Sequence, residues 1–73
     1  MIDPGWIREG MTVRDLEGRK LGTVANLEAM QFEVEQGWPA QRDYVVKVRA
    51  VARIDGQDII LTRSPGVRAL PED

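Results

Sequence analysis

The chain has 73 residues, of which 42% are apolar and 30% charged, and its formal net charge is -2. Because it contains no cysteine and no histidine, the sequence excludes disulfides, thiolate or histidine metal sites, and nucleophiles activated by histidine. We expect one folded domain over residues 1–73, without catalytic residues, cofactor or metal. The sequence shows neither a basic, apolar leader nor an apolar run long enough to span a bilayer, which predicts a cytoplasmic protein without membrane insertion.

The first residues predict a short helical turn. Asp3 followed by Pro4 is typical of a helix start, because the aspartate can cap free amides and proline has no N–H to lose. We expect this turn over residues 3–9, with Trp6 and Ile7 as its contacts with the core.

From residue 11 onward the apolar side chains recur at every second position, which predicts strands. A short strand over 11–14 leads into a turn at 15–18, and a longer strand follows over 21–27. We expect the odd-numbered residues of the longer strand to share one face. Gly22 predicts a bulge or a sharp coil within it.

The third strand, over 31–35, has the clearest alternation, with Phe32 and Val34 inside. Glu33 and Glu35 share the opposite face, where they could be read as part of a metal site or as an acid/base pair. Since that face points to solvent and supplies no third ligand, we interpret them as a solvated surface.

The second half of the chain predicts a loop, three further strands and a tail. Alternation indicates strands at 44–48, 51–54 and 58–63, with a hairpin turn at Asp55-Gly56 between the last two. Short strands of this kind favour an all-β domain built as a small closed or half-open, mostly antiparallel barrel of about six strands. Its core is expected at about 6–63, and residues 64–73 form a C-terminal turn and tail.

One stretch resembles a phosphate-binding loop, because Gly18 and Gly22 flank the cations Arg19 and Lys20. A Walker loop, however, places its lysine after the second glycine and begins a helix at once. Here the lysine comes first and a strand continues. We therefore interpret the stretch as a hairpin with two exposed charges.

The candidate interaction surface lies after the third strand. Trp38 sits in a polar loop next to a proline, where it acts either as a lid on the core or as an interface anchor. Residues 42–68 hold six basic and three acidic side chains, which suggests an acidic partner or RNA. The hypothetical surface consists of Trp38, Arg42, Lys47, Arg49 and Arg53.

The order of two motifs is familiar: I-x-x-G-M-x-V over 7–13, then D-x-x-G-x-x-x-G-T-V over 15–24. With the segments 51–56 and 59–61, it resembles the bacterial DUF2171 family, which is similar to PRC-barrel domains. Those domains occur in the photosynthetic reaction centre H subunit and in the ribosome maturation factor. Lys47 departs from the pattern, since family members commonly carry proline there.

This resemblance implies a barrel of about six strands without catalytic residues, used in relatives to dock onto proteins. We therefore expect a non-enzymatic module that acts through contact with a protein partner or with itself, as a homodimer. Nucleic-acid binding is not expected from the acidic balance. The alternative is an RNA- or ribosome-associated barrel that uses the basic 42–53 segment.

Overall fold

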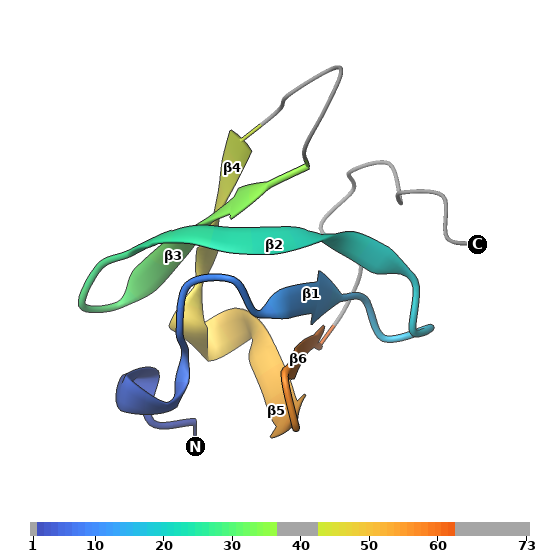
Figure 1. Ribbon diagram of the computed structural model, residues 1–73. Helices are drawn as coiled ribbons and strands as arrows, with labels where there is room; N and C mark the ends of the chain where they lie inside the picture. Colours follow the sequence, from blue (N-terminus) through green and yellow to red (C-terminus); the bar gives the residue numbers. More distant parts are fainter. Residues whose placement is uncertain (1, 37–42, 63–73) are drawn as a thin grey trace.

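The computed structural model of the chain describes residues 2–36 and 43–62, and these form a single sheet with two short 3-10 turns (Figure 1). The all-β prediction is confirmed for these residues. The elements in chain order are η1 (Pro4–Trp6), β1 (Thr12–Arg14), β2 (Lys20–Leu27), β3 (Gln31–Glu35), β4 (Asp43–Lys47), η2 (Val48–Ala50), β5 (Val51–Asp55) and β6 (Asp58–Leu61). No helix in the described ranges is long and apolar enough to cross a membrane.

The six strands lie in the order β4-β3-β2-β1-β6-β5. Every neighbouring pair is antiparallel except β1 and β6, which are parallel. Among the described strands the two edges, β4 and β5, are not paired with each other, so a closed barrel is not confirmed. Yet η2 alone separates β4 from β5 in the chain. The sheet therefore curls until its opposite edges meet at this corner (Figure 1).

The N-terminal turn is shorter than predicted, because η1 covers only Pro4–Trp6. Asp3 caps it as expected, and its Oδ1 accepts a hydrogen bond from the Gly5 N–H at 2.8 Å. Ile7 then adopts an extended conformation and is buried. Since the chain straightens there, the neighbouring Trp6 side chain points away and is 57% exposed, and its predicted core contact is wrong.

The predicted bulge in β2 is confirmed, but the predicted alternation of faces is wrong. The register of β2 shifts against β1 beside Gly22, and it shifts against β3 at Ala25. Each extra residue turns the following side chains to the other face. Leu21 and Val24 are consequently both buried, whereas Leu27 is 40% exposed.

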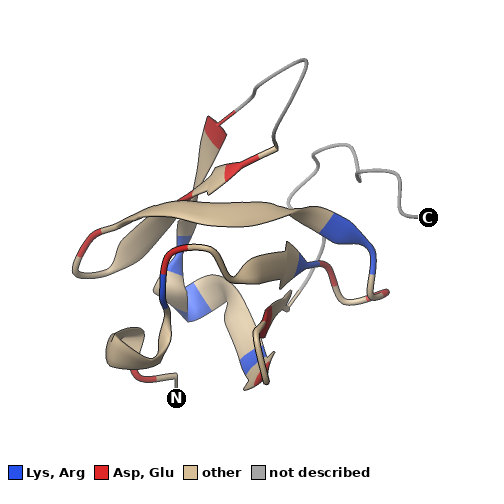
Figure 2. Cartoon of the chain, in the orientation of Figure 1, with Lys and Arg blue, Asp and Glu red and all other residues tan. Residues whose placement is uncertain are grey.

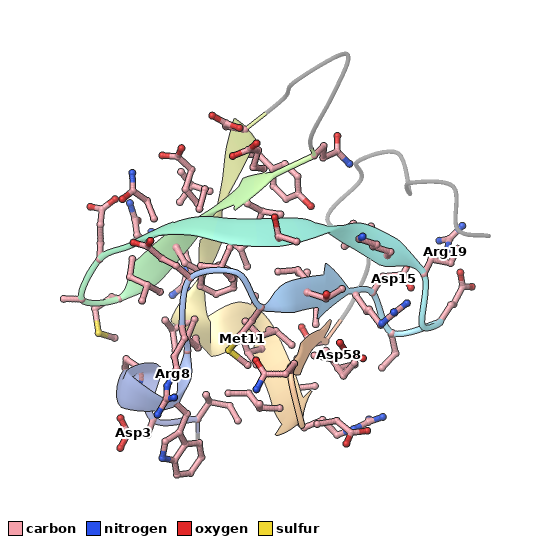
Figure 3. The ribbon with its side chains drawn as sticks, viewed as in Figure 1. Asp3, Arg8, Met11, Asp15, Arg19 and Asp58 are labelled. Atoms are coloured by element: carbon pink, nitrogen blue, oxygen red, sulfur yellow. The ribbon has the colours of Figure 1, made fainter. Side chains whose placement is uncertain are left out.

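The core fills the inner side of the curled sheet. Phe32 and Val34 are fully buried, as the alternation of β3 predicts. Met11 is buried at the start of β1, and its Sδ accepts a hydrogen bond from the Arg8 N–H at 3.2 Å (Figure 3). The connected core consists of Ile7, Met11, Val13, Leu21, Val24, Phe32, Val34, Val46, Val48, Val51, Ile59 and Leu61.

Candidate interaction surface

The hydrogen bonding of β4 follows from one contact just beyond its end. The Val48 N–H donates to the Met30 C=O at 3.0 Å, which marks these opposed residues as a hydrogen-bonded pair. In an antiparallel ladder such pairs recur at every second residue. Val46 and Tyr44, the next two even-numbered residues, therefore bond to β3, opposite Phe32 and Val34.

The odd-numbered residues of β4 turn their backbone groups away from β3, toward the free side of the sheet. No described strand lies on that side. The edge there presents the N–H and C=O groups of Asp43 and Val45 and the N–H of Lys47. All three side chains are exposed, and Val45, in the centre, is 54% exposed.

This edge also carries a repulsive pair. Asp43 lies directly opposite Glu35 on β3, in the closely spaced, non-hydrogen-bonded kind of pair. Like charges in this arrangement destabilise a sheet. Within the described residues neither carboxylate forms an ion pair. Figure 2 shows that acidic positions occur on both β3 and β4.

The opposite edge of the sheet is protected. In β5 the register against β6 shifts between Val51 and Arg53, which inserts Ala52 as a bulge. Arg53 is exposed in the middle of the strand. Bulges and charged side chains are the usual means of blunting an edge. β4 has charged residues only at its ends, Asp43 and Lys47, and its register against β3 shows no bulge, so its centre is the more open of the two edges.

The predicted interaction residues are brought together only in part. Lys47 ends β4, Arg49 lies in η2, and Arg53 lies in β5, so these three cations follow the corner between the two edges (Figure 2). All are exposed, and none forms an ion pair within the described part of the chain. Trp38 and Arg42 lie outside the described residues.

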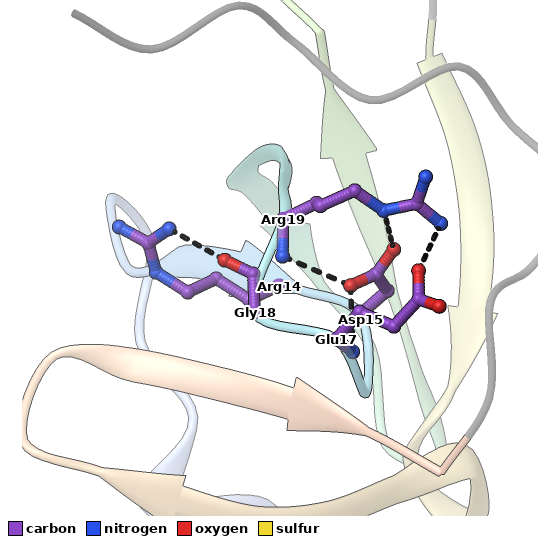
Figure 4. A network of polar contacts seen from close by, with 5 residues as sticks. All are labelled: Arg14, Asp15, Glu17, Gly18 and Arg19. Carbon is purple, nitrogen blue, oxygen red and sulfur yellow. Dashed lines mark hydrogen bonds and ion pairs between the residues drawn. The ribbon is translucent and has the colours of Figure 1, made fainter.

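The sequence interpretation missed a polar network in the turn between β1 and β2 (Figure 4). Asp15 is buried, and one carboxylate oxygen accepts hydrogen bonds from the N–H groups of Glu17 and Arg19, each at 2.9 Å. The other oxygen accepts from the Arg19 Nε at 2.8 Å. Arg19 also pairs with Glu17 at 2.8 Å, so it is not simply an exposed charge.

This pairing decides against the phosphate-loop interpretation. The Arg19 guanidinium is directed at two carboxylates, which occupy it and would repel a phosphate. The signal in the sequence was the spacing of Asp15 and Gly18, since aspartate at the start of a turn bonds to the backbone two residues on.

Competing effects set the charge state of Asp15. Burial alone raises its pKa, but the hydrogen bonds and charge of Arg19, together with the Glu17 N–H, hold the pKa below the ordinary value of 3.8. The carboxylate is therefore ionised at neutral pH and serves as the structural centre of the turn.

Tyr44 carries an unsatisfied polar atom in β4. Its phenol oxygen is buried and has no hydrogen-bond partner among the described residues. Burial raises the pKa of Tyr44 from 10.0 to about 12. The neutral phenol is thus the form that the folded protein accommodates.

Replacing Tyr44 by phenylalanine is expected to raise the free energy of unfolding by up to about 1 kcal/mol, because it removes a buried hydroxyl that has no partner among the described residues. The pKa is higher in the folded than in the unfolded chain. The contribution of neutral Tyr44 is therefore complete below pH 10 and is lost as the pH rises toward about 12. Urea unfolding across this range should show a smaller alkaline loss for Tyr44→Phe, and equal losses would contradict the burial of the phenol.

No group of three or more acidic side chains in the described ranges converges as a metal site would require. Glu33 and Glu35 lie on the outer face of β3, as predicted. They belong with Asp43 to the surface of the open edge.

Comparison with known proteins returns one family. A family model described as "Uncharacterized protein conserved in bacteria (DUF2171)" matches residues 7–66. No curated protein matches the chain, and no solved structure does.

Proposed function

The chain belongs to the DUF2171 family of bacterial proteins, and from this premise we propose that it is a non-enzymatic, PRC-barrel-like module that acts through protein contact. Because the family's description assigns no activity, the proposal rests on the surface of the sheet. The open β4 edge is the feature that carries it.

An unpaired strand edge is a template for another extended chain, since its free N–H and C=O groups can bond to a partner backbone. Natural sheets protect such edges, and β5 shows that protection in its bulge and its arginine. β4 has neither device at its centre, where Val45 is apolar and half exposed. A partner strand would cover that side chain and satisfy the backbone groups on either side of it.

The barrel-like part of the proposal is supported by the corner at η2. A mostly antiparallel sheet of six strands begins at β4 and ends at β5, and the three residues of η2 join these two edges. Such strong curling is the geometry from which small barrels are built.

Site-specific photo-crosslinking tests the contact. A photoreactive phenylalanine derivative replaces Val45 on the open edge, and in a matched control it replaces Arg53 on the blunted edge. Irradiation in the native cell should give a discrete adduct at position 45, identified by mass spectrometry as this chain or as one other protein. The same diffuse background from both positions would remove the β4 edge as a contact site.

A second candidate function, RNA association, rests on a separate observation: Lys47, Arg49 and Arg53 are exposed along one corner and lack ion pairs among the described residues. Among the described residues, Phe32 is buried and Tyr44 is half-buried with a covered hydroxyl, so neither of these rings is free to stack on a base.

For this alternative, a fluorescently labelled single-stranded RNA should bind at low salt and be released steeply as salt is added, because phosphate contacts release counterions. Arg49→Glu with Arg53→Glu should abolish the anisotropy change. Arg8→Glu, a reversal near the N-terminal turn, should preserve it. Absence of binding at low salt, or equal loss in all variants, would remove the alternative.

A further inference from the structure

The partner that best fits the β4 edge is a second copy of the same edge. We propose that two chains associate through antiparallel β4–β4 pairing about a two-fold axis at Val45, so that Val45 lies opposite Val45 of the partner subunit. This inference rests on the proposed contact function and names the partner for it.

The register follows from which residues face outward. A hydrogen-bonded pair across the new interface requires an outward-facing residue from each copy, and on β4 these are Asp43, Val45 and Lys47. A two-fold axis at Val45 pairs Val45 with Val45 of the partner subunit, and at each end it sets the Lys47 N–H against the C=O of Asp43 of the partner subunit. Shifting one strand by two residues would leave outward groups without a partner, and shifting it by one would place them against inward-facing residues.

The charges match in the same register. Asp43 comes to lie opposite the partner subunit's Lys47, and Lys47 lies opposite Asp43 of the partner subunit. The partner's Lys47 then stands on one side of Asp43 while Glu35 stands on the other. The repulsion between the two carboxylates within one chain is thereby offset by a cation from the next. Isologous dimers need this kind of self-complementarity.

The surrounding structure sets the strength of the association. Each copy contributes one strand of five residues, and the connected core of the described residues lies within a single copy. An interface of this length falls at the small end of the size range for specific contacts. We therefore expect a reversible, concentration-dependent dimer rather than an obligate one.

Charge reversal provides the test, with sedimentation velocity of the full chain over a range of concentrations as the readout. Asp43→Lys places two lysines opposite each other twice per dimer, and Lys47→Asp does the same with two aspartates. Each variant alone should weaken dimerisation about tenfold or more.

Two complementary samples should restore the dimer. An equal mixture of the Asp43→Lys and Lys47→Asp proteins forms opposite-charge pairs only in the heterodimer. The double variant forms them again in the homodimer. Asp43→Lys should also raise the stability of the monomer, because it replaces the repulsion from Glu35 by attraction. Weaker dimerisation together with a more stable fold cannot arise from misfolding.

The outcomes separate the two proposals. A dimer that is insensitive to both reversals, or that the mixture does not restore, overturns the β4 pairing. A strictly monomeric wild-type chain overturns self-association, while a position-45 crosslink to another protein would leave the contact function standing. Loss of both the dimer and the crosslink overturns the contact function as well.

Discussion

Replacing Gly22 by alanine is expected to lower the free energy of unfolding by about 3 kcal/mol, measured by urea denaturation. A Cβ atom at this position would lie 2.8 Å from the Val34 Cγ1 and closer still to the backbone oxygen of Glu35. The obstacle includes main chain of β3, which cannot rotate away as a flexible side chain could. Strands β2 and β3 would have to separate, at the centre of the buried face.

Gly18→Ala is the control for this substitution. Gly18 has a φ of 87°, a conformation that residues with a side chain rarely adopt, but a Cβ atom there would meet no atom within 4 Å. The Gly18→Ala substitution is therefore expected to lower the free energy of unfolding by about 1 kcal/mol, from backbone conformation alone. Equal losses for the two variants would show that close packing at Gly22 has no separate effect.

Replacing Asp15 by asparagine is expected to lower the free energy of unfolding by about 2 kcal/mol at neutral pH, measured in the same way. Asparagine keeps the volume, but its amide cannot supply two acceptor oxygens to the Glu17 N–H, the Arg19 N–H and the Arg19 Nε. Arg19→Met is the matched variant, because it keeps the Asp15 carboxylate and its two backbone hydrogen bonds and removes only the guanidinium that bonds to Oδ2. It should cost about 1 kcal/mol, less than Asp15→Asn.

The free energies of unfolding of the wild-type protein and of Asp15→Asn should depend differently on pH in acid. Since the pKa of Asp15 is lower in the folded than in the unfolded chain, its contribution is complete above the ordinary value of 3.8. It is lost as the pH falls below 3.8 and through the folded value. The stability difference between the two proteins should therefore narrow in acid, and a difference independent of pH would contradict the role of the ionised carboxylate.

The strands could be predicted because their pattern is local. Phe32 and Val34 alternate with charged residues, and a half-buried strand is the structure that separates them. The hairpin between β5 and β6 could be predicted from Asp55-Gly56, but its turn lies one residue later, on Gly56-Gln57. Asp55 still pairs with Asp58 as the last residue of β5, and Gly56 supplies the positive φ of the turn.

The features that could not be predicted depend on how segments pair and pack in the folded chain. The bulges that turn Leu27 outward arise from how β2 pairs with β1 and β3. The hydrogen-bond network at Asp15 could not be predicted, because it forms only when the turn folds over the carboxylate. A helical turn over residues 3–9 predicts core contacts for both Trp6 and Ile7. Because the turn covers only three residues and Ile7 is extended, Ile7 is buried and Trp6 is exposed.

The candidate surface could be predicted only in part. Lys47, Arg49 and Arg53 were identified by charge, and the structure places them along one corner. The open edge could not be foreseen, because the strand order decides whether β4 is central or peripheral. In the sequence Val45 has the pattern of an ordinary strand residue. Its exposure at an edge follows only from the strand order, in which no described strand lies on the second side of β4.

The parallel pairing of β1 with β6 has a consequence for how the chain folds. Strands β1 to β4 follow one another as hairpins, as do β5 and β6, so each group can form from nearby residues. Among the described strands only the β1–β6 ladder joins the two groups, and it places Val13 opposite Ile59, both fully buried. Contacts between distant residues form slowly, because the intervening loop must first close. During synthesis the core therefore cannot be completed until β6 has left the ribosome. Until then β1 is paired with β2 on one side and has no neighbouring strand on the other.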